Sequence, residues 1–126
     1  MLIVEDQRDL REIYAAYLRA ASFRVETASH GGEAVWAAID LVPDVVVMDL
    51  RLPHLDGWEA IRRLKSDQRT SHIPVIACTG DVLGGAAERA LDAGCDAYLV
   101  KPVFARDLVR EVRKLLPRRR DLRRHA

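Results

Sequence analysis

The sequence has few of the features that mark secreted or membrane-spanning proteins. Its two cysteines, Cys78 and Cys95, lie 17 positions apart without a Cys-x-x-Cys pair, which excludes a disulfide scaffold and argues against a zinc site. The longest uninterrupted apolar runs have six residues, whereas a spanning helix needs roughly 20. The chain turns acidic at Glu5, unlike a secretory signal. We therefore expect a cytoplasmic protein that does not enter a membrane.

What is present suits one domain followed by a short tail. The 126 residues are 49% hydrophobic and 31% charged, enough for a real core and too apolar for a disordered chain. Residues 118–126 hold five arginines and one aspartate, a net +4, which leaves 15 basic and 18 acidic residues, a net −3, on the rest. We predict a domain over residues 1–116 and a solvated basic tail over 117–126 that reads no specific nucleic acid sequence.

Short apolar runs rich in branched side chains recur along the chain, at 2–4, 45–48, 75–77 and 97–100. Continuous runs of this length are typical of strands buried on both faces of a parallel sheet. The segment 23–27 differs, because its apolar and charged residues alternate. That alternation predicts an edge strand.

Between these runs, apolar residues recur at helical spacing. Such stripes run through 10–21, 58–64 and 104–115, where Ile13, Tyr17 and Phe104 are among the positions expected to face the core. Shorter helical stretches follow Gly31-Gly32 and cover 86–93, with Gly94 at the place of a C-terminal glycine. Five strands and five helices in strict alternation predict an α/β fold, a five-stranded parallel sheet with helices on both faces.

Chemistry is expected at the carboxyl ends of the strands, where open parallel sheets bind their ligands. Glu5-Asp6, Asp49, Thr79 and Lys101 each follow a predicted strand. Three carboxylates close together repel one another, and one lysine offsets only one of their charges. The remaining charge of −2 and the oxygen ligands suit a single Mg2+ better than zinc or copper.

A carboxylate held beside Mg2+ and a lysine can accept a phosphoryl group. Asp49 is the predicted nucleophile, Lys101 and Mg2+ would neutralise the phosphoryl oxygens, and Thr79 can donate a hydrogen bond to another oxygen. A lone aspartate at a strand end is more often a helix cap. With the other four residues in register, the catalytic interpretation is the stronger one.

With these residues in this order, the chain resembles the receiver domain of two-component response regulators, over residues 1–116. The resemblance is carried by the acidic pair Glu5-Asp6, by Asp49-Leu-Arg-Leu-Pro-His-Leu-Asp-Gly57 with Pro53 and Gly57 at the family's spacing, by Thr79-Gly80, by Tyr98 and by Lys101-Pro102. It implies a flavodoxin-like (βα)5 sandwich with strand order 2-1-3-4-5. Each motif alone is weak, but their order and separations together are specific.

The resemblance also implies roles for individual residues. Asp6 and Asp49 would bind Mg2+, with Glu5 acting directly or through water and the backbone carbonyl of Arg51 completing the protein's ligands. The phosphoryl group would come from a phosphohistidine on a sensor histidine kinase or phosphotransfer protein. Such a domain is not an enzyme for other substrates, because it catalyses only its own phosphorylation and dephosphorylation.

Further expectations concern the switch. By resemblance, Thr79 and Tyr98 are its moving residues, and the bond between Lys101 and Pro102 is cis. Read from the residues alone, Tyr98 could equally be a half-buried core aromatic. Gly84-Gly85 would weaken the first turn of the fourth helix. The output would be a changed surface of the fourth helix, fifth strand and fifth helix, read by an unknown downstream protein or by a second copy of the chain.

Alternative functions remain at this stage. A haloacid-dehalogenase-like phosphotransfer enzyme also uses an aspartyl nucleophile, but it carries a second aspartate where this chain has Arg51. A flavin-binding flavodoxin-like domain needs a phosphate loop where this chain has Glu5-Asp6. The arginine tail could bind nucleic acid without sequence selectivity. Finally, the chain could be the receiver part of a longer DNA-binding or hybrid-kinase protein.

Overall fold

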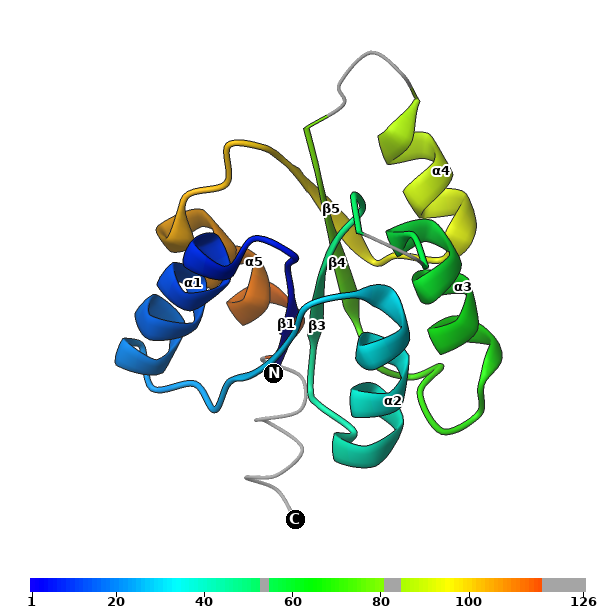
Figure 1. Ribbon diagram of the computed structural model, residues 1–126, viewed down its shortest axis with the longest axis horizontal. Helices are drawn as coiled ribbons and strands as arrows, with labels where there is room; N and C mark the ends of the chain where they lie inside the picture. The colour runs from blue at the N-terminus through cyan, green and yellow to red at the C-terminus, as the bar shows by residue number, and fades with distance from the viewer. Residues whose placement is uncertain (53–54, 81–84, 117–126) are drawn as a thin grey trace.

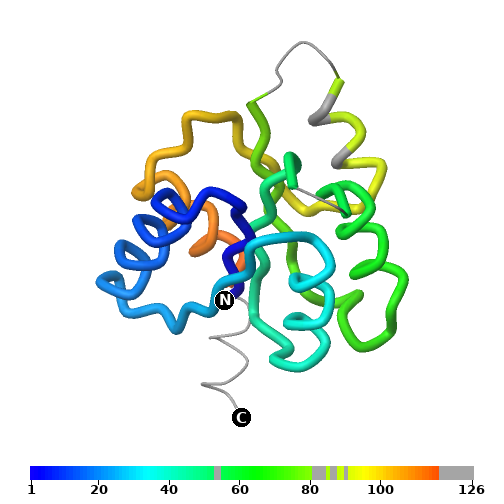
Figure 2. The backbone as a smooth tube through the Cα atoms, viewed as in Figure 1, coloured from blue at the N-terminus to red at the C-terminus, as the bar shows by residue number. Residues whose placement is uncertain are grey.

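The computed structural model describes residues 1–52, 55–80 and 85–116, and its path is drawn in Figures 1 and 2. The basic tail, Pro53 and Gly84 lie outside these described residues. Within them, strands and helices alternate as the periodicity predicts. The elements are β1 (Leu2–Val4), α1 (Arg8–Ala20), β2 (Glu26–Ala28), α2 (Gly31–Leu41), β3 (Val46–Asp49), α3 (Gly57–Ser66), β4 (Val75–Thr79), α4 (Ala86–Ala93), β5 (Ala97–Val100) and α5 (Ala105–Leu115).

The sheet has the order β2-β1-β3-β4-β5, and all of its neighbouring strands run parallel. The predicted order 2-1-3-4-5 is therefore confirmed. At the carboxyl ends, the ladders pair Asp49 with Cys78 and Thr79 with Val100. The residues at the carboxyl ends of β1, β3, β4 and β5 consequently meet at the same end of the sheet.

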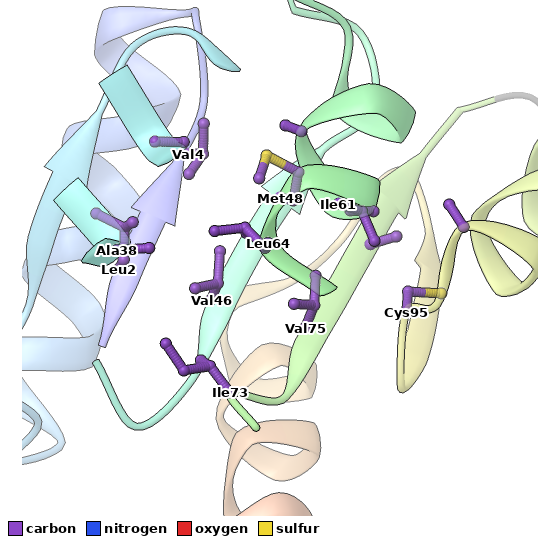
Figure 3. Close-up of a cluster of buried hydrophobic side chains, with 14 of the residues drawn as sticks. Leu2, Val4, Ala38, Val46, Met48, Ile61, Leu64, Ile73, Val75 and Cys95 are labelled. Carbon is purple, nitrogen blue, oxygen red and sulfur yellow. The ribbon is translucent and has the colours of Figure 1, made fainter. Parts of the chain in front are cut away.

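Two apolar clusters fill the space on either side of the sheet. One holds Leu2 and Val4 with buried side chains of α2 and α3, and Figure 3 shows its centre. The other holds Ile3 with side chains of α1 and α5. Successive residues of β1 thus enter opposite clusters, as the period of two in a strand requires. In Figure 1, α1 and α5 cover one face, and α2, α3 and α4 cover the other.

The predicted core face of two helices was too wide. Ile13 and Tyr17 on α1 are 60% and 47% exposed, and Phe104 is 58% exposed. The residues that α1 buries are Tyr14, Ala15 and Leu18. A helix that lies on a sheet and touches one neighbouring helix buries a narrow stripe, and Ile13 and Tyr17 fall beside it. Phe104 precedes α5 and is not part of it.

The two edge strands also differ from their predicted patterns. The segment 23–27 pairs later than expected, since β2 begins at Glu26. The run 97–100 was expected to be buried on both faces, but β5 is an edge strand on which Tyr98 and Val100 are 42% and 41% exposed. Ala97 and Leu99 pack against the cluster beneath α1 and α5. Tyr98 and Val100 alternate with these residues and point to the other face of the sheet, which is less well covered at β5.

Glycines delimit α4. The helix ends at Ala93, and Gly94 follows with φ +108°, which confirms the predicted C-terminal glycine. Gly85 has φ +77° and precedes the helix. The expectation that Gly85 weakens the interior of the first turn is therefore wrong, because this glycine serves the entry to the helix.

Across the described residues, no helix combines the length and the apolar character that crossing a membrane requires.

Candidate functional site

A pocket opens at the carboxyl edge of the sheet. It has a volume of about 350 Å3 and is lined by Asp6, Gln7, Asp49, Arg51, Gly80 and Lys101. Its walls come from the segments that follow β1, β3, β4 and β5, which the strand order places next to one another. This is the position that the sequence predicts for the chemistry of the chain.

The carboxylates of Glu5, Asp6 and Asp49 converge at this pocket, where one oxygen from each lies within 4.8 Å of the others. Glu5 and Asp49 are only 2% and 4% exposed, whereas Asp6 is exposed to solvent. Two buried carboxylates and one solvent-exposed carboxylate therefore lie close together. Such a cluster is costly unless a positive charge lies against it.

Lys101 supplies part of that positive charge. Its Nζ lies 2.9 Å from Asp49 Oδ2 and 3.4 Å from Glu5 Oε1. Burial by itself would lower the pKa of Lys101, but the hydrogen bond to Asp49 and the neighbouring acids hold this pKa above its usual value. The lysine therefore stays charged at neutral pH.

Backbone groups orient the two buried acids. The amide of Arg51 donates to Asp49 Oδ1 at 3.0 Å, and the amide of Gln7 donates to Glu5 Oε2 at 3.3 Å. The guanidinium of Arg11 donates to the carbonyl oxygen of Glu5 at 2.9 Å. These contacts fix the loop after β1 and the start of the loop after β3.

Tyr14 holds the loop between β5 and α5, which carries Lys101. Its hydroxyl on α1 donates to the carbonyl oxygen of Val103 at 2.9 Å. Val103 follows the cis peptide bond between Lys101 and Pro102. Sequence reasoning assigned no site role to Gln7, Arg11 or Tyr14. The position of Gln7 beside the acidic pair was a usable signal, whereas the other two contacts depend on how α1 packs.

The remaining predicted residues lie at the margin of the pocket. Thr79 is buried at the end of β4, and its carbonyl oxygen accepts from the amide of Lys101 at 2.7 Å. It is not among the pocket-lining residues; its neighbour Gly80 is. Tyr98 lies on β5 with its side chain largely outside the core. Its exposure disfavours the interpretation as a core aromatic.

The donors present fit a hard divalent cation. All three converging side chains offer carboxylate oxygens, which Mg2+ prefers. With Lys101 ionised, three carboxylates and one ammonium leave a formal charge of −2. The open mouth beside Asp6 leaves room for water ligands, which Mg2+ usually retains. Glu5, Asp6 and Asp49 are thus able to hold Mg2+, and Arg51 lines the same pocket.

Burial and the neighbouring carboxylates change the pKa of Glu5. Burial, followed by hydrogen bonding with Asp49 and Asp6, raises the pKa of Glu5 from 4.5 to about 7. Without a cation, the folded chain therefore holds a proton on Glu5 more tightly than the unfolded chain does. Ionising Glu5 in the fold costs stability, so the free energy of unfolding should fall as pH rises from about 4.5 to about 7.

We expect Mg2+ to stabilise the protein more at pH 8 than at pH 6. At pH 8 Glu5 is ionised and ready to face the cation, whereas at pH 6 the cation must displace a proton. Urea unfolding with and without Mg2+ at both values measures the two increments. In Glu5→Gln the difference between them should shrink strongly. Equal increments at both pH values in the unaltered chain would contradict this prediction.

Gly57 lies directly against the backbone of Asp49 and Leu50. A Cβ at position 57 would lie 2.6 Å from the carbonyl oxygen of Asp49 and 2.6 Å from Leu50 Cα. The amide of Gly57 also donates to the carbonyl oxygen of Leu50 at 3.2 Å. Only a residue without a side chain lets the start of α3 approach the backbone of Asp49 this closely.

Gly57→Ala should therefore displace the backbone of Asp49. We expect the free energy of unfolding to fall by about 1–3 kcal/mol, as for other overpacked sites, together with weaker Mg2+ binding. Gly32→Ala on α2 is the matched control, because a Cβ there would meet only the His30 side chain at 3.6 Å. The control should unfold at the same or a higher urea concentration. A Gly57→Ala protein as stable as this control would show that the contact is unimportant.

Comparison with known proteins agrees with this geometry. The family described as the response regulator receiver domain matches residues 1–113. The polar-differentiation response regulator DivK of Brucella ovis is 32% identical over 116 residues, which cover 92% of this chain and 94% of DivK. The DNA-binding dual master transcriptional regulator RpaA of Synechocystis is 34% identical over 94% of this chain. The chain spans about half of RpaA, since the match covers 49% of that protein.

Solved structures show the same fold. The receiver domain of the sensor histidine kinase PA1611 from Pseudomonas aeruginosa, described with a magnesium ion coordinated in its active-site cleft, has a TM-score of 0.85 and 35% identity, covering 91% of this chain and 94% of that one. A response regulator from Chloroflexus aurantiacus has a TM-score of 0.85 and 30% identity, covering 91% and 94% of the two chains. With its strand order, its acidic cluster and these relatives, the chain belongs to the family of response regulator receiver domains.

Proposed function

We propose that the chain is a phosphorylation-switched receiver that accepts a phosphoryl group on Asp49 in a Mg2+-dependent reaction. The donor would be a phosphohistidine of a sensor histidine kinase or a phosphotransfer protein in the cytoplasm. One observation carries the proposal: a buried aspartate whose Oδ2 lies 2.9 Å from the ammonium of Lys101, beside the carboxylates of Glu5 and Asp6. This arrangement pairs a nucleophile with the positive charge that a transferred phosphoryl group needs.

The proposed step is a displacement at phosphorus. A carboxylate oxygen of Asp49 forms the new bond to phosphorus while the bond from phosphorus to the histidine nitrogen breaks, and the imidazole leaves with that electron pair. Lys101 compensates negative charge on the phosphoryl oxygens, and Thr79 donates to one of them. Mg2+ bound by Glu5, Asp6, Asp49 and the carbonyl of Arg51 would neutralise further charge on the same oxygens.

The rival functions find less support. The position of the second aspartate in a haloacid-dehalogenase-like enzyme is occupied by Arg51, whose amide donates to Asp49. The two acids after β1 would repel a flavin phosphate. The acceptor is a side chain of the protein itself, so the chemistry supports a signalling domain that acts only on its own phosphorylation state.

The output surface follows from the exposed side chains near β5. Leu91 on α4 and Tyr98 and Val100 on β5 are 50%, 42% and 41% exposed. A shift of Thr79 toward a phosphoryl oxygen would open space for Tyr98 to turn inward, changing the surface of α4, β5 and α5. A downstream protein, or a second phosphorylated copy, would read that change. In a longer DNA-binding or hybrid-kinase chain, the same surface would face another domain.

The direct test is chemical. The unaltered protein is incubated with a small phosphodonor and Mg2+, and the adduct is mapped by mass spectrometry under conditions that preserve acyl phosphates. We expect one adduct, on Asp49, which hydroxylamine removes and an excess of chelator prevents. An adduct on another residue, or one that forms equally well with chelator, would refute the proposal.

A further inference from the structure

One side-chain contact joins α3, the helix that follows Asp49 in the chain, to α4, which belongs to the proposed output surface. Arg89 on α4 lies over the ring of Trp58 on α3, with its Cζ 4.1 Å from the ring centroid. This separation is within the distance of about 6 Å that defines a cation–π contact, for which tryptophan is the best ring and arginine the more frequent cation. The two helices lie side by side in Figure 1.

Trp58 is tied closely to Asp49. It follows Gly57, the residue that is pressed against the carbonyl oxygen of Asp49 and the Cα of Leu50. A displacement of the Asp49 backbone therefore has to be passed to the first turn of α3, where the tryptophan ring stands. From the ring, the stacked guanidinium of Arg89 continues the same chain of contacts into α4.

The other end of α4 is anchored separately. Gly94, directly after the helix, approaches Lys65 on α3, whose Cγ would lie 3.0 Å from a Cβ at that position. Lys65 itself is held by Asp96 at 3.0 Å and by the carbonyl oxygen of Ile73 at 2.8 Å. With its C-terminal end fixed in this way, α4 can respond to the site by moving the part that carries Arg89.

We propose that Arg89 is a positioning residue that couples the state of Asp49 to the placement of α4 through its stack on Trp58. The stack favours the phosphoryl-free placement and is lost when Asp49 carries a phosphoryl group. This inference rests on the proposed function. Because coupling between two sites is reciprocal, weakening the stack must then make binding of a phosphoryl analogue more favourable.

The expected effect is modest and measurable. An exposed cation–π contact changes an equilibrium constant by about two- to fivefold. Arg89→Gln should therefore bind beryllium fluoride, in the presence of Mg2+, about two- to fivefold more tightly than the unaltered chain. Trp58→Leu should show a similar gain, and the double variant no more than either single one. Arg89→Lys, which keeps the charge but loses the planar stack, should fall between.

Calorimetric titration with beryllium fluoride and Mg2+ measures these affinities. Glu88→Gln, an exposed neighbour on the same helix, is the matched control and should bind as the unaltered chain does. A purely structural role of Arg89 would lower stability in urea without raising the affinity. Equal affinities for Arg89→Gln and Glu88→Gln, or additive gains in the double variant, would overturn the proposal.

Tryptophan emission provides an independent readout. In a Trp36→Phe background, which removes a 74% exposed tryptophan on α2, beryllium fluoride should change the emission of Trp58, and Arg89→Gln should abolish most of that change. Binding with unchanged emission would refute the loss of the stack while leaving the receiver function intact. No calorimetric binding by the unaltered chain would overturn the receiver function and the coupling together.

Discussion

Asp49→Asn is expected to abolish phosphorylation of the chain by a small phosphodonor, with a loss of labelling of at least about 100-fold. The side-chain amide is a poor nucleophile and cannot form an acyl phosphate. The substitution also removes one of the three carboxylates that meet at the pocket, so Mg2+ should bind more weakly. Intact mass measured after incubation with donor and Mg2+ gives the labelled fraction directly.

Asp56→Asn is the matched control for this experiment. Asp56 lies in the same loop region and caps α3, where its side chain accepts from the amide of Glu59 at 2.8 Å. Asparagine caps helices about as well as aspartate does, so Asp56→Asn should fold normally and label as the unaltered chain does. If labelling survived in Asp49→Asn and disappeared in Asp56→Asn, the phosphoryl acceptor would be Asp56, and our assignment of Asp49 would be wrong.

Lys101→Met is expected to separate metal binding from phosphoryl transfer. The ammonium lies 2.9 Å from Asp49 and 3.4 Å from Glu5, but it is not a metal ligand, so Mg2+ affinity should be kept or should rise as positive charge leaves the site. Labelling should fall by about 100- to 1,000-fold, the loss typical when one preorganised stabilising donor is removed from a transition state. Initial labelling rates at saturating Mg2+ measure the effect.

The control for Lys101 is Lys114→Met. Lys114 lies on the exposed side of α5, where it pairs with Glu111 at 3.1 Å, and surface pairs of this kind contribute little. The Lys114→Met protein should therefore be phosphorylated at the same rate as the unaltered chain. Lys101→Arg keeps the charge with a different shape and should recover part of the rate. If Lys101→Met lost its Mg2+ binding instead, the lysine would have a structural role in the metal site that we do not assign to it.

The site could be predicted from the sequence because its residues follow strands. Strands of a parallel sheet end at the same edge, so the positions of Glu5, Asp49, Thr79 and Lys101 along the chain already implied their convergence. The apolar runs before them can be recognised from the local sequence, without knowledge of how the elements pack. For the same reason the ten elements of the described residues could be predicted, apart from the start of β2, whereas the strand order was implied only by the resemblance to receiver domains.

Tertiary structure alone decided which neighbours support and expose these residues. Tyr14 reaches Val103 across 89 positions of sequence, and Arg89 reaches Trp58 between two helices; periodicity records neither contact. The exposure of Ile13, Tyr17 and Tyr98 likewise depends on where a second helix or strand happens to cover an apolar face. Apolar spacing determines which residues can face a core, but the packing of distant elements determines which of them do.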